Sequence, residues 1–400
     1  MTYDSDLNYR FGGKTLKVGV IGCGIRARVL IHTLSQLNVN TRLTAVCDLK
    51  GEEILRVLAA DGEDISQTKL YTDADTMLSQ EELDGVIIGS RTESHVELAK
   101  KVLSRGLPLM IEKPITTSLE ELIDLRNAYE KSNKQVLVSF PLRASPLVEL
   151  AREIIESGKI GTVEHVQAVN YVPYGGVYYH NWYRRAGVGG LFFEKSTHDF
   201  DYLNYLVGQH PTELAAMATQ RIFGGEYPDD KTCPDCERLL DCPESPFNQK
   251  HIAIDNPRGE LCAFAKSIEN HDSAGVLIRY PSGLHVNYAE NYFARKGAQA
   301  RGARLSGYRG TLEFDWYQNK LTVHMHHTPR VDTYAYDADT EGHFGGDAQL
   351  MLCFAGMMRG ERTSIAPLEA GFESTLMCIA ARASVKSRAF ERIGWKEQSI

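Results

Sequence analysis

Several features that mark particular protein classes are scarce or missing in this chain. Basic charge is not in surplus, since 44 Lys and Arg stand against 52 Asp and Glu, a formal net charge of -8. Binding to nucleic-acid phosphates is therefore not expected. No apolar run reaches the roughly 18 residues of a membrane span. The first residues lack an apolar signal core, and eight cysteines are too sparse for a disulfide framework. We therefore expect a cytoplasmic protein that does not enter membranes.

The composition that remains is that of a folded globular protein. Hydrophobic residues make up 43% and charged residues 24%, and no internal repeat or low-complexity tract is present. Four hundred residues exceed the size of one ordinary hydrophobic core. We therefore predict two domains, residues 1–142 and 143–400.

The first domain alternates short apolar runs with amphipathic segments. The longer apolar runs have no polar face, which is typical of strands buried in a parallel sheet. The strand–helix alternation predicts an α/β Rossmann domain with right-handed crossovers. The predicted strands are 16–21, 43–48, 69–71, 85–90, 107–111 and 135–139, and the predicted helices are 25–37, 52–60, 93–104 and 119–131.

The second domain has a different pattern. Strand signals follow one another with connections suited to antiparallel pairing, which predicts an α+β domain with an open, largely antiparallel sheet. The predicted strands are 163–172, 274–280, 284–292, 311–315 and 320–325, and the predicted helices are 147–157, 197–206, 348–358 and 367–386. Residues 224–259, rich in Pro, Asp and Cys, are expected to form a long loop or small subdomain.

A glycine-rich turn follows the first predicted strand. Residues 22–27 read GxGxxA, in which Gly22 permits the tight turn, Gly24 lets the backbone approach a pyrophosphate, and Ala27 keeps the helix close to the sheet. The helix N-terminus then offers N–H groups to the phosphates. Asp48, at the end of the second strand, can accept both ribose hydroxyls and repels a 2′-phosphate. The pattern predicts NAD as cofactor, with NADP less favoured, although Lys50 could soften that preference.

The fifth predicted strand ends in Glu112-Lys113-Pro114. The carboxyl ends of strands in such a sheet line the ligand crevice, so Lys113 is expected beside the nicotinamide. A Lys-Pro bond adopts the cis form at modest cost, which would fix the direction of the ammonium.

Taken together, the motifs resemble those of the Gfo/Idh/MocA oxidoreductase family, over almost the whole chain. The resemblance rests on GxGxxA at 22–27, the EKP triplet at 112–114, and Gly189-Gly190 followed by a carboxylate and histidine. Glu194, His198 and Asp201 match the family's D-x-x-x-H-x-x-D spacing, with Glu194 in place of the usual Asp. Further departures are Lys195, Ser196, and Arg91-Thr92 where Pro-Asn is usual. These differences concern the substrate rather than the class of reaction.

The resemblance implies roles for particular residues. Oxidation of a secondary alcohol requires removal of its proton while hydride leaves the same carbon, and a fixed cation stabilises the developing alkoxide. We assign these tasks to His198 and Lys113, with Glu194 orienting the imidazole as its i, i+4 helical neighbour. The expected cofactor-binding residues are Gly22, Gly24, Ile25, Arg26, Asp48, Ser90, His95, Glu112 and Lys113, and the expected substrate residues are Arg143, Tyr179, Trp182, Arg184, Lys195 and Asp201.

An aromatic loop, residues 171–185, contains six aromatic side chains together with His, Asn and two Arg residues. Flat aromatic faces suit the C–H face of a sugar ring, and Arg184, Arg185 and Lys195 could hold an anionic group on it. An oligomer interface explains the same composition. His343 and Asp347, in a second polar turn, are expected near the same pocket.

Four cysteines have the spacing C-x2-C-x5-C-x19-C, namely Cys233, Cys236, Cys242 and Cys262. Four thiolates so spaced suit a tetrahedral structural Zn²⁺. One CxxC with uneven partners is also compatible with ordinary loop cysteines.

The leading hypothesis is an NAD-dependent dehydrogenase of a sugar, sugar acid or cyclitol, working as a homo-oligomer (a dimer or tetramer formed through the second domain's sheet). An NAD-dependent glycosidase that acts by transient oxidation and elimination would use the same residues. A non-catalytic sugar-responsive binding protein is a third alternative, which retention of both Lys113 and His198 disfavours.

Overall fold

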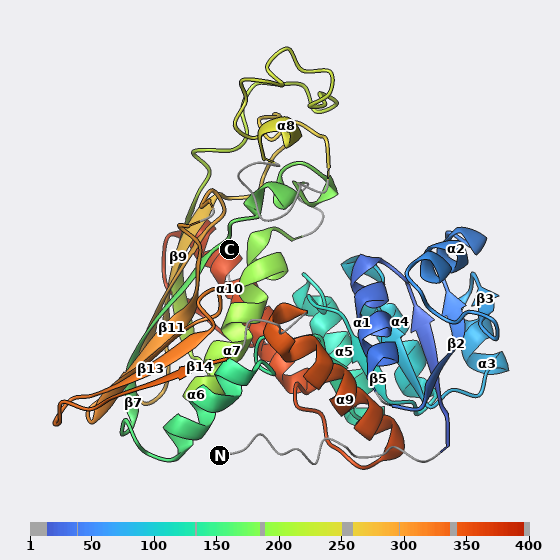
Figure 1. The fold of residues 1–400 in the computed structure, drawn as a ribbon, viewed down its shortest axis with the longest axis horizontal. Helices are drawn as coiled ribbons and strands as arrows, with labels where there is room; N and C mark the ends of the chain where they lie inside the picture. The colour runs from blue at the N-terminus through green and yellow to red at the C-terminus, as the bar shows by residue number, and fades with distance from the viewer. Residues whose placement is uncertain are drawn as a thin grey trace. The chain divides into compact units, whose positions relative to one another are not determined.

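The computed structural model describes residues 14–37, 39–132, 134–184, 189–249, 259–295, 297–336 and 342–395. The chain forms two compact units, one of residues 1–145 with 341–372 and one of residues 146–340 with 373–400 (Figure 1). None of the helices in the described ranges has the length and hydrophobicity of a membrane span.

The first unit is built on a six-stranded parallel sheet of order β3-β2-β1-β4-β5-β6. Its central strands are buried on both faces, which agrees with their unbroken apolar sequences. The predicted Rossmann fold is confirmed. The strands are β1 (Leu16–Ile21), β2 (Thr41–Cys47), β3 (Lys69–Tyr71), β4 (Gly85–Ile88), β5 (Leu109–Ile111) and β6 (Val136–Val138), and the helices are α1 (Ile25–Gln36), α2 (Glu52–Ala60), α3 (Ala74–Gln80), α4 (His95–Ser104) and α5 (Leu119–Ser132).

A late segment of the chain also belongs to the first unit, although the boundary predicted at residue 142 places it in the second domain. This segment contains the 3-10 turn η7 (His343–Gly345) and helix α9 (Gly346–Arg359). A Cβ on Gly85 would lie 2.7 Å from Met358 Cγ and 3.0 Å from the Phe354 ring. The close approach shows that α9 packs tightly at the start of β4. Sequence periodicity locates a helix but not the unit on which it packs.

The second unit carries a nine-stranded sheet of order β14-β13-β12-β11-β7-β10-β9-β8-β15, in which only β7 and β10 pair in parallel. The predicted open, largely antiparallel sheet is confirmed. Its strands are β7 (Val163–Tyr171), β8 (Glu213–Thr219), β9 (Ser273–Arg279), β10 (His285–Asn291), β11 (Ala300–Gly307), β12 (Gly310–Asp315), β13 (Lys320–Met325), β14 (Val331–Ala335) and β15 (Glu391–Arg392), and its helices are α6 (Pro146–Glu156), α7 (Thr197–Val207), α8 (Pro246–Gln249) and most of α10 (Leu368–Ser387).

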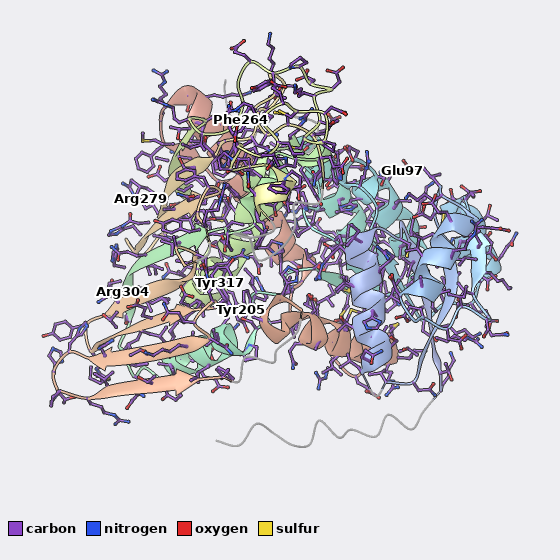
Figure 2. All side chains as sticks on the ribbon, turned by 45° about the horizontal axis from the view of Figure 1, so that its top comes forward. Glu97, Tyr205, Phe264, Arg279, Arg304 and Tyr317 are labelled. Atoms are coloured by element: carbon purple, nitrogen blue, oxygen red, sulfur yellow. The ribbon has the colours of Figure 1, made fainter. Side chains whose placement is uncertain are left out.

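The two faces of this second sheet differ. Helices α6 and α7 lie along one face, and the Tyr205 hydroxyl of α7 donates to Glu149 of α6 at 2.8 Å (Figures 1 and 2). The other face carries exposed side chains, including Leu277, Arg279 and Arg304 (Figure 2). Alternating burial along β9 and β13 reflects this arrangement.

Four strands and two α-helices of the described chain were not predicted: β8, β11, β14, β15, α3 and α8. β8 is rich in alanine, and β11 reads ARGARLSG, so neither has the composition of an isolated strand. They are strands because they extend a sheet whose neighbours supply the pairing. α3 has only seven residues and begins where the Asp73 side chain accepts from the Thr76 amide.

Candidate active site

The glycine turn of the first unit has the backbone that its sequence predicts. Gly22 has φ +75°, and a Cβ there would lie 2.4 Å from Ser90 Cα. A Cβ on Gly89 would lie 2.4 Å from the Ala27 methyl, so a larger residue than Ala at position 27 would push α1 off the sheet. Gly24 provides the N-cap of α1 without a side chain over the first amides. The turn therefore presents bare N–H groups at the positive end of a helix, as a pyrophosphate requires.

Asp48 follows β2 and is tied to the same turn. Its Oδ2 accepts from the Cys23 amide at 2.8 Å, and its Oδ1 accepts from the Lys50 amide at 2.9 Å. The Lys50 ammonium lies 3.2 Å from Glu53 instead. The carboxylate is thus fixed by backbone donors, as expected for a ribose acceptor.

Arg26 makes contacts that the sequence did not reveal. Its guanidinium donates to Glu112 at 3.1 Å and to Asp347 at 2.8 Å. His343 Nδ1 lies 3.0 Å from the same Asp347 carboxylate. Burial acts to raise the pKa of Asp347, but the hydrogen bonds from Arg26 and His343 hold that pKa below its ordinary value. Arg26 therefore joins the glycine turn to the EKP segment and, through Asp347, to the start of α9.

The EKP segment is held by His95. The Lys113–Pro114 peptide bond is cis, the form that was considered possible from the sequence. His95 is buried, with Nδ1 2.9 Å from the Pro114 carbonyl and Nε2 3.0 Å from the Ser90 carbonyl. The imidazole thus links the end of β4 to the turn that carries Lys113. Among the other predicted cofactor residues, Ile25 is 53% exposed on the first turn of α1.

In the second unit, Glu194 and Lys195 lie in a π-helix, η6 (Phe192–Ser196), which runs directly into α7. The predicted helix was regular, with Glu194 and His198 as i, i+4 neighbours. The wider π-helical turn changes that spacing, and such turns are frequent at functional sites. Glu194, His198 and Asp201 are all buried.

A row of buried polar residues lies beneath η6 and α7. The sequence did not predict this row. Asn170, Glu290 and Arg301 face one another in register across β7, β10 and β11. Arg301 donates to Asp199 of α7 at 3.1 and 3.0 Å, and Asn170 donates to the same carboxylate at 2.7 Å.

Glu290 holds the π-helix η6 in place through hydrogen bonds to its carboxylate. Its carboxylate accepts from the hydroxyls of Ser196 at 2.7 Å, Tyr288 at 3.0 Å and Tyr292 at 2.9 Å, and lies 2.6 Å from His271 Nε2. Glu290 holds Ser196, whereas Arg301 and Asn170 hold Asp199. Because these two residues flank the Thr197–His198 pair, the row fixes the position of His198. The alternation of buried and exposed residues along each strand does not predict this row. The three strands are far apart in the sequence and become neighbours only when the sheet forms.

Lys195 contacts the aromatic loop. Its ammonium donates to the Tyr174 hydroxyl at 2.7 Å and lies 5.3 Å from the Tyr178 ring centroid. Burial acts to raise the pKa of Tyr174, but the cationic Lys195 and Arg301 leave that pKa below its ordinary value. The pair is a buried, charge-assisted hydrogen bond beside Glu194.

The structure separates the predicted substrate residues into accessible and inaccessible ones. Trp182 is 40% exposed and stacks on Tyr183, with ring centroids 4.0 Å apart. Tyr179 is fully buried, and its hydroxyl donates to the His271 carbonyl at 2.7 Å. Arg184 is 1% exposed and donates to the Cys262 carbonyl at 3.0 Å. Tyr179 and Arg184 therefore stabilise the loop instead of facing a ligand, because a buried phenol or guanidinium needs its own partner.

Two further predicted positions fall elsewhere. Arg143 belongs to the first unit, where it is buried and donates to the Ile365 carbonyl at 3.3 Å. Arg185 lies outside the described residues. The expected anion-binding trio of Arg184, Arg185 and Lys195 is therefore not assembled in the described structure.

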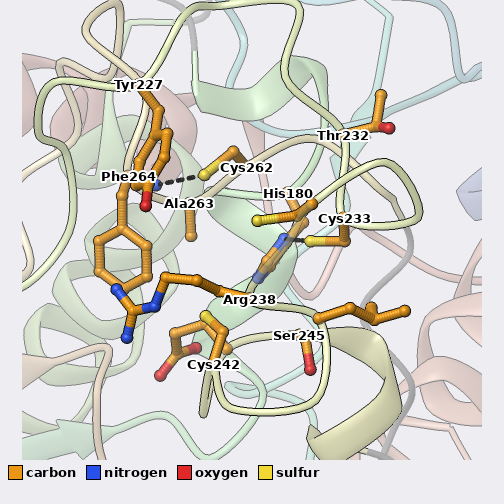
Figure 3. Close-up of a pocket in the computed structure, with 13 residues that line it drawn as sticks. His180, Tyr227, Thr232, Cys233, Arg238, Cys242, Ser245, Cys262, Ala263 and Phe264 are labelled. Atoms are coloured by element: carbon orange, nitrogen blue, oxygen red, sulfur yellow. Dashed lines mark hydrogen bonds between the residues drawn. The ribbon is translucent and has the colours of Figure 1, made fainter.

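The four predicted zinc cysteines lie around one pocket, which His180 also lines (Figure 3). All four are free thiols. In the described part of the chain, no three His, Cys, Asp or Glu side chains are already arranged around a common metal position.

Comparison with known proteins agrees with this geometry. Residues 16–140 match the family model described as an oxidoreductase family with an NAD-binding Rossmann fold, and residues 148–313 match the GFO/IDH/MocA C-terminal domain. The rhizopine catabolism protein MocA of Rhizobium meliloti is 26% identical over 72% of this chain and 90% of its own length. Inositol 2-dehydrogenase of Rhizobium meliloti strain 1021 is 25% identical over 70% of this chain and 80% of its own length.

Solved structures share the fold at lower identity. Levoglucosan dehydrogenase in complex with NADH and levoglucosan superposes with a TM-score of 0.75 at 16% identity, covering 95% of this chain and 100% of that one. The glycine turn with Asp48, the EKP segment and the two matched domains lead to one conclusion: this chain belongs to the Gfo/Idh/MocA family of NAD-binding oxidoreductases.

Proposed function

We propose that the chain catalyses reversible hydride transfer between NAD and a secondary alcohol of a sugar, sugar acid or cyclitol. The proposal rests mainly on one observation. The chain has both a lysine and a histidine of the kind that the reaction needs, and neighbouring residues hold each of them in place. Lys113 stands at the carboxyl end of β5, held by His95, and His198 stands at the start of α7, held through Asp199 and Ser196. A protein that only binds ligands has no need of two such supports.

Lys113 and His198 divide the chemistry between them. NAD supplies a hydride acceptor when bound. His198 takes the hydroxyl proton as the alcohol is oxidised, while the Lys113 ammonium stabilises the negative charge that develops on the same oxygen. Glu194, buried in the π-helix four residues before His198, orients the imidazole rather than exchanging the proton.

A carbohydrate-like substrate is supported by two observations. The exposed face of Trp182 offers the apolar plane on which a sugar ring packs. Among the relatives and fold neighbours are an inositol 2-dehydrogenase and a levoglucosan dehydrogenase.

A panel of substrates tests the proposal. The protein is incubated with NAD⁺ and free sugars, cyclitols, uronates and aryl glycosides, and the absorbance of NADH is followed. We expect NADH from at least one polyol class, and its loss in His198→Ala, with partial recovery at high pH where hydroxide replaces the base. Aglycone release without net NADH would indicate an oxidoreductive glycosidase instead, and NAD binding without any turnover would favour a sensor.

A further inference from the structure

The cysteine-rich segment, residues 224–272, is the least regular part of the second unit. Its described residues contain one short helix, α8, and two isolated bridges, Tyr227–Ala265 and Thr232–Leu261. Sheet pairing therefore accounts for little of its order. Figure 1 shows it extending beyond one end of the sheet.

Four thiols from two stretches of this segment meet at one place. Cys233, Cys236 and Cys242 come from the first stretch and Cys262 from the second, and all line the same pocket (Figure 3). The two stretches are joined by backbone hydrogen bonds, from Cys233 N to the Glu260 carbonyl at 2.7 Å and from Cys262 N to the Lys231 carbonyl at 2.9 Å. The Phe264 amide donates to Cys262 Sγ at 3.4 Å, which fixes the position of that thiol.

His180 brings a fifth donor atom to the pocket from the aromatic loop. Its ring is buried, and Nδ1 lies 2.7 Å from the Leu261 carbonyl, which can only accept. Nδ1 therefore carries the hydrogen, and in the neutral ring Nε2 keeps a bare lone pair. That Nε2 is buried and makes no hydrogen bond of regular geometry within the described ranges, although the Glu244 backbone also interacts with the ring. A histidine that donates one ring N–H to a carbonyl and presents the other nitrogen is the usual form of a metal ligand.

We propose that this pocket binds one soft divalent ion of the zinc class in tetrahedral coordination. Cys233 and Cys236, the CxxC pair, supply two ligands, and the other two come from Cys242, Cys262 and His180. Since the donors surround the pocket without a shared centre, binding requires the thiols to turn inward. Each ligating thiol gives up its proton, and no electron is transferred, because Zn²⁺ has no redox chemistry.

The ion would also order the aromatic loop. The Leu261 amide donates to the His180 carbonyl at 3.0 Å, and Arg184 donates to the Cys262 carbonyl at 3.0 Å. Residues on both sides of Trp182 are thus attached to the metal-binding stretch. The zinc site does not depend on the proposed function. An effect of zinc on substrate binding does rest on the proposed function.

Metal content is measured on the full chain, purified anaerobically without chelator and then equilibrated with Zn²⁺ and desalted. We expect about one equivalent per chain by elemental analysis, and with Co²⁺ an intense thiolate-to-cobalt absorption with the d–d bands of a tetrahedral ion. Wild-type protein that retains no stoichiometric Zn²⁺, or alkylation showing a Cys233–Cys236 disulfide in freshly lysed cells, would overturn the proposal.

Variants identify the ligands. Cys236→Ser should lose stoichiometric Zn²⁺, whereas Cys378→Ser, a buried cysteine bonded to the Phe192 carbonyl elsewhere in the second unit, should retain it. If Cys236→Ser does not fold, competition of wild-type protein with a chromophoric chelator replaces it, and failure to withhold Zn²⁺ from a weak chelator contradicts the site. His180→Ala should change the Co²⁺ spectrum if Nε2 is a ligand, and an unchanged spectrum at full occupancy assigns four thiolates.

Hydrogen exchange tests the link to the loop separately from activity. Zn²⁺ should slow exchange of amides 174–184 by about tenfold or more, because opening the loop would then require ligand release. Zn²⁺ bound at one equivalent with unchanged exchange there would contradict the ordering role. Failure of the substrate panel would leave both results standing.

Discussion

At the scale of single residues, the enzyme proposal depends most on Lys113. Lys113→Ala should lower turnover by about 100-fold or more, the usual scale for loss of one preorganised stabiliser of developing charge. NAD affinity should change little, since the glycine turn and Asp48 hold the phosphates and ribose. Steady-state kinetics on a verified substrate and calorimetric NAD titration measure the two effects. Lys134→Ala, an exposed lysine before β6, serves as the control. Near-normal turnover of Lys113→Ala would contradict the mechanism.

Cofactor preference is a second residue-scale prediction, and it rests on Asp48. NAD⁺ should bind at least about tenfold more tightly than NADP⁺, since a fixed carboxylate facing a 2′-phosphate costs over ~1.4 kcal/mol. Asp48→Asn should reduce the ratio of NAD⁺ affinity to NADP⁺ affinity. Lys50→Ala should leave it unchanged, because the Lys50 ammonium lies against Glu53. Equal or tighter binding of NADP⁺ to the wild type would show that Asp48 does not face the ribose.

The pair of Arg26 and Asp347 gives a pH-dependent prediction. Because the folded-state pKa of Asp347 is held below its unfolded value, the carboxylate adds stability above the unfolded pKa of about 3.9, and this is lost as pH falls through the folded pKa. Asp347→Asn should therefore be less stable than the wild type at pH 6, and the difference should shrink below about pH 4. Urea titrations across that range measure it. The exposed Asp124→Asn should differ little throughout, and a constant deficit in Asp347→Asn would refute the linkage.

At the scale of elements, the polar row across β7, β10 and β11 supports the helix that carries His198. Arg301→Leu should lower the free energy of unfolding of the second unit by about 3–5 kcal/mol, because it leaves the buried Asp199 carboxyl without its cationic partner. Arg304→Leu, on the opposite face of the same strand, should change it by less than about 1 kcal/mol. The variants are compared by denaturation, monitored with a spectroscopic probe in the second unit. Equal losses of stability in the two variants would contradict a particular role of the polar row.

At the scale of the whole molecule, we propose that the exposed face of the second unit's sheet is the interface of a homo-oligomer. Met217, 77% exposed, and Leu277, 49% exposed, lie on this face in neighbouring strands. Leu277→Glu should convert a dimer or tetramer into smaller species by placing like charges in an apolar contact. Light scattering after gel filtration reads the mass, with Leu240→Glu in the cysteine-rich segment as control. A wild-type monomer, or an unaffected variant, would contradict this interface.

Much of the fold and part of the site follow from local sequence. Gly22, Gly24 and Asp48 were predicted correctly as a turn and its neighbouring carboxylate because the requirement is a backbone conformation and a spacing, both of which a linear pattern contains. For the Lys113–Pro114 bond, two adjacent residues indicated only that the cis form was accessible. The buried parallel strands followed from apolar runs without a polar face.

Other features were decided only by tertiary structure. Asn170, Glu290 and Arg301 form a row because β7, β10 and β11 pair in one register, over more than a hundred residues of sequence. Tyr179 and Arg184 have the composition of ligand contacts, but packing buries them on loop carbonyls. The cysteine spacing suggested a metal, yet only the folded loop showed His180 Nε2 in the same pocket. Side-chain partners that come from distant segments depend on which surfaces pack together, and that information is spread over the whole chain rather than held in any motif.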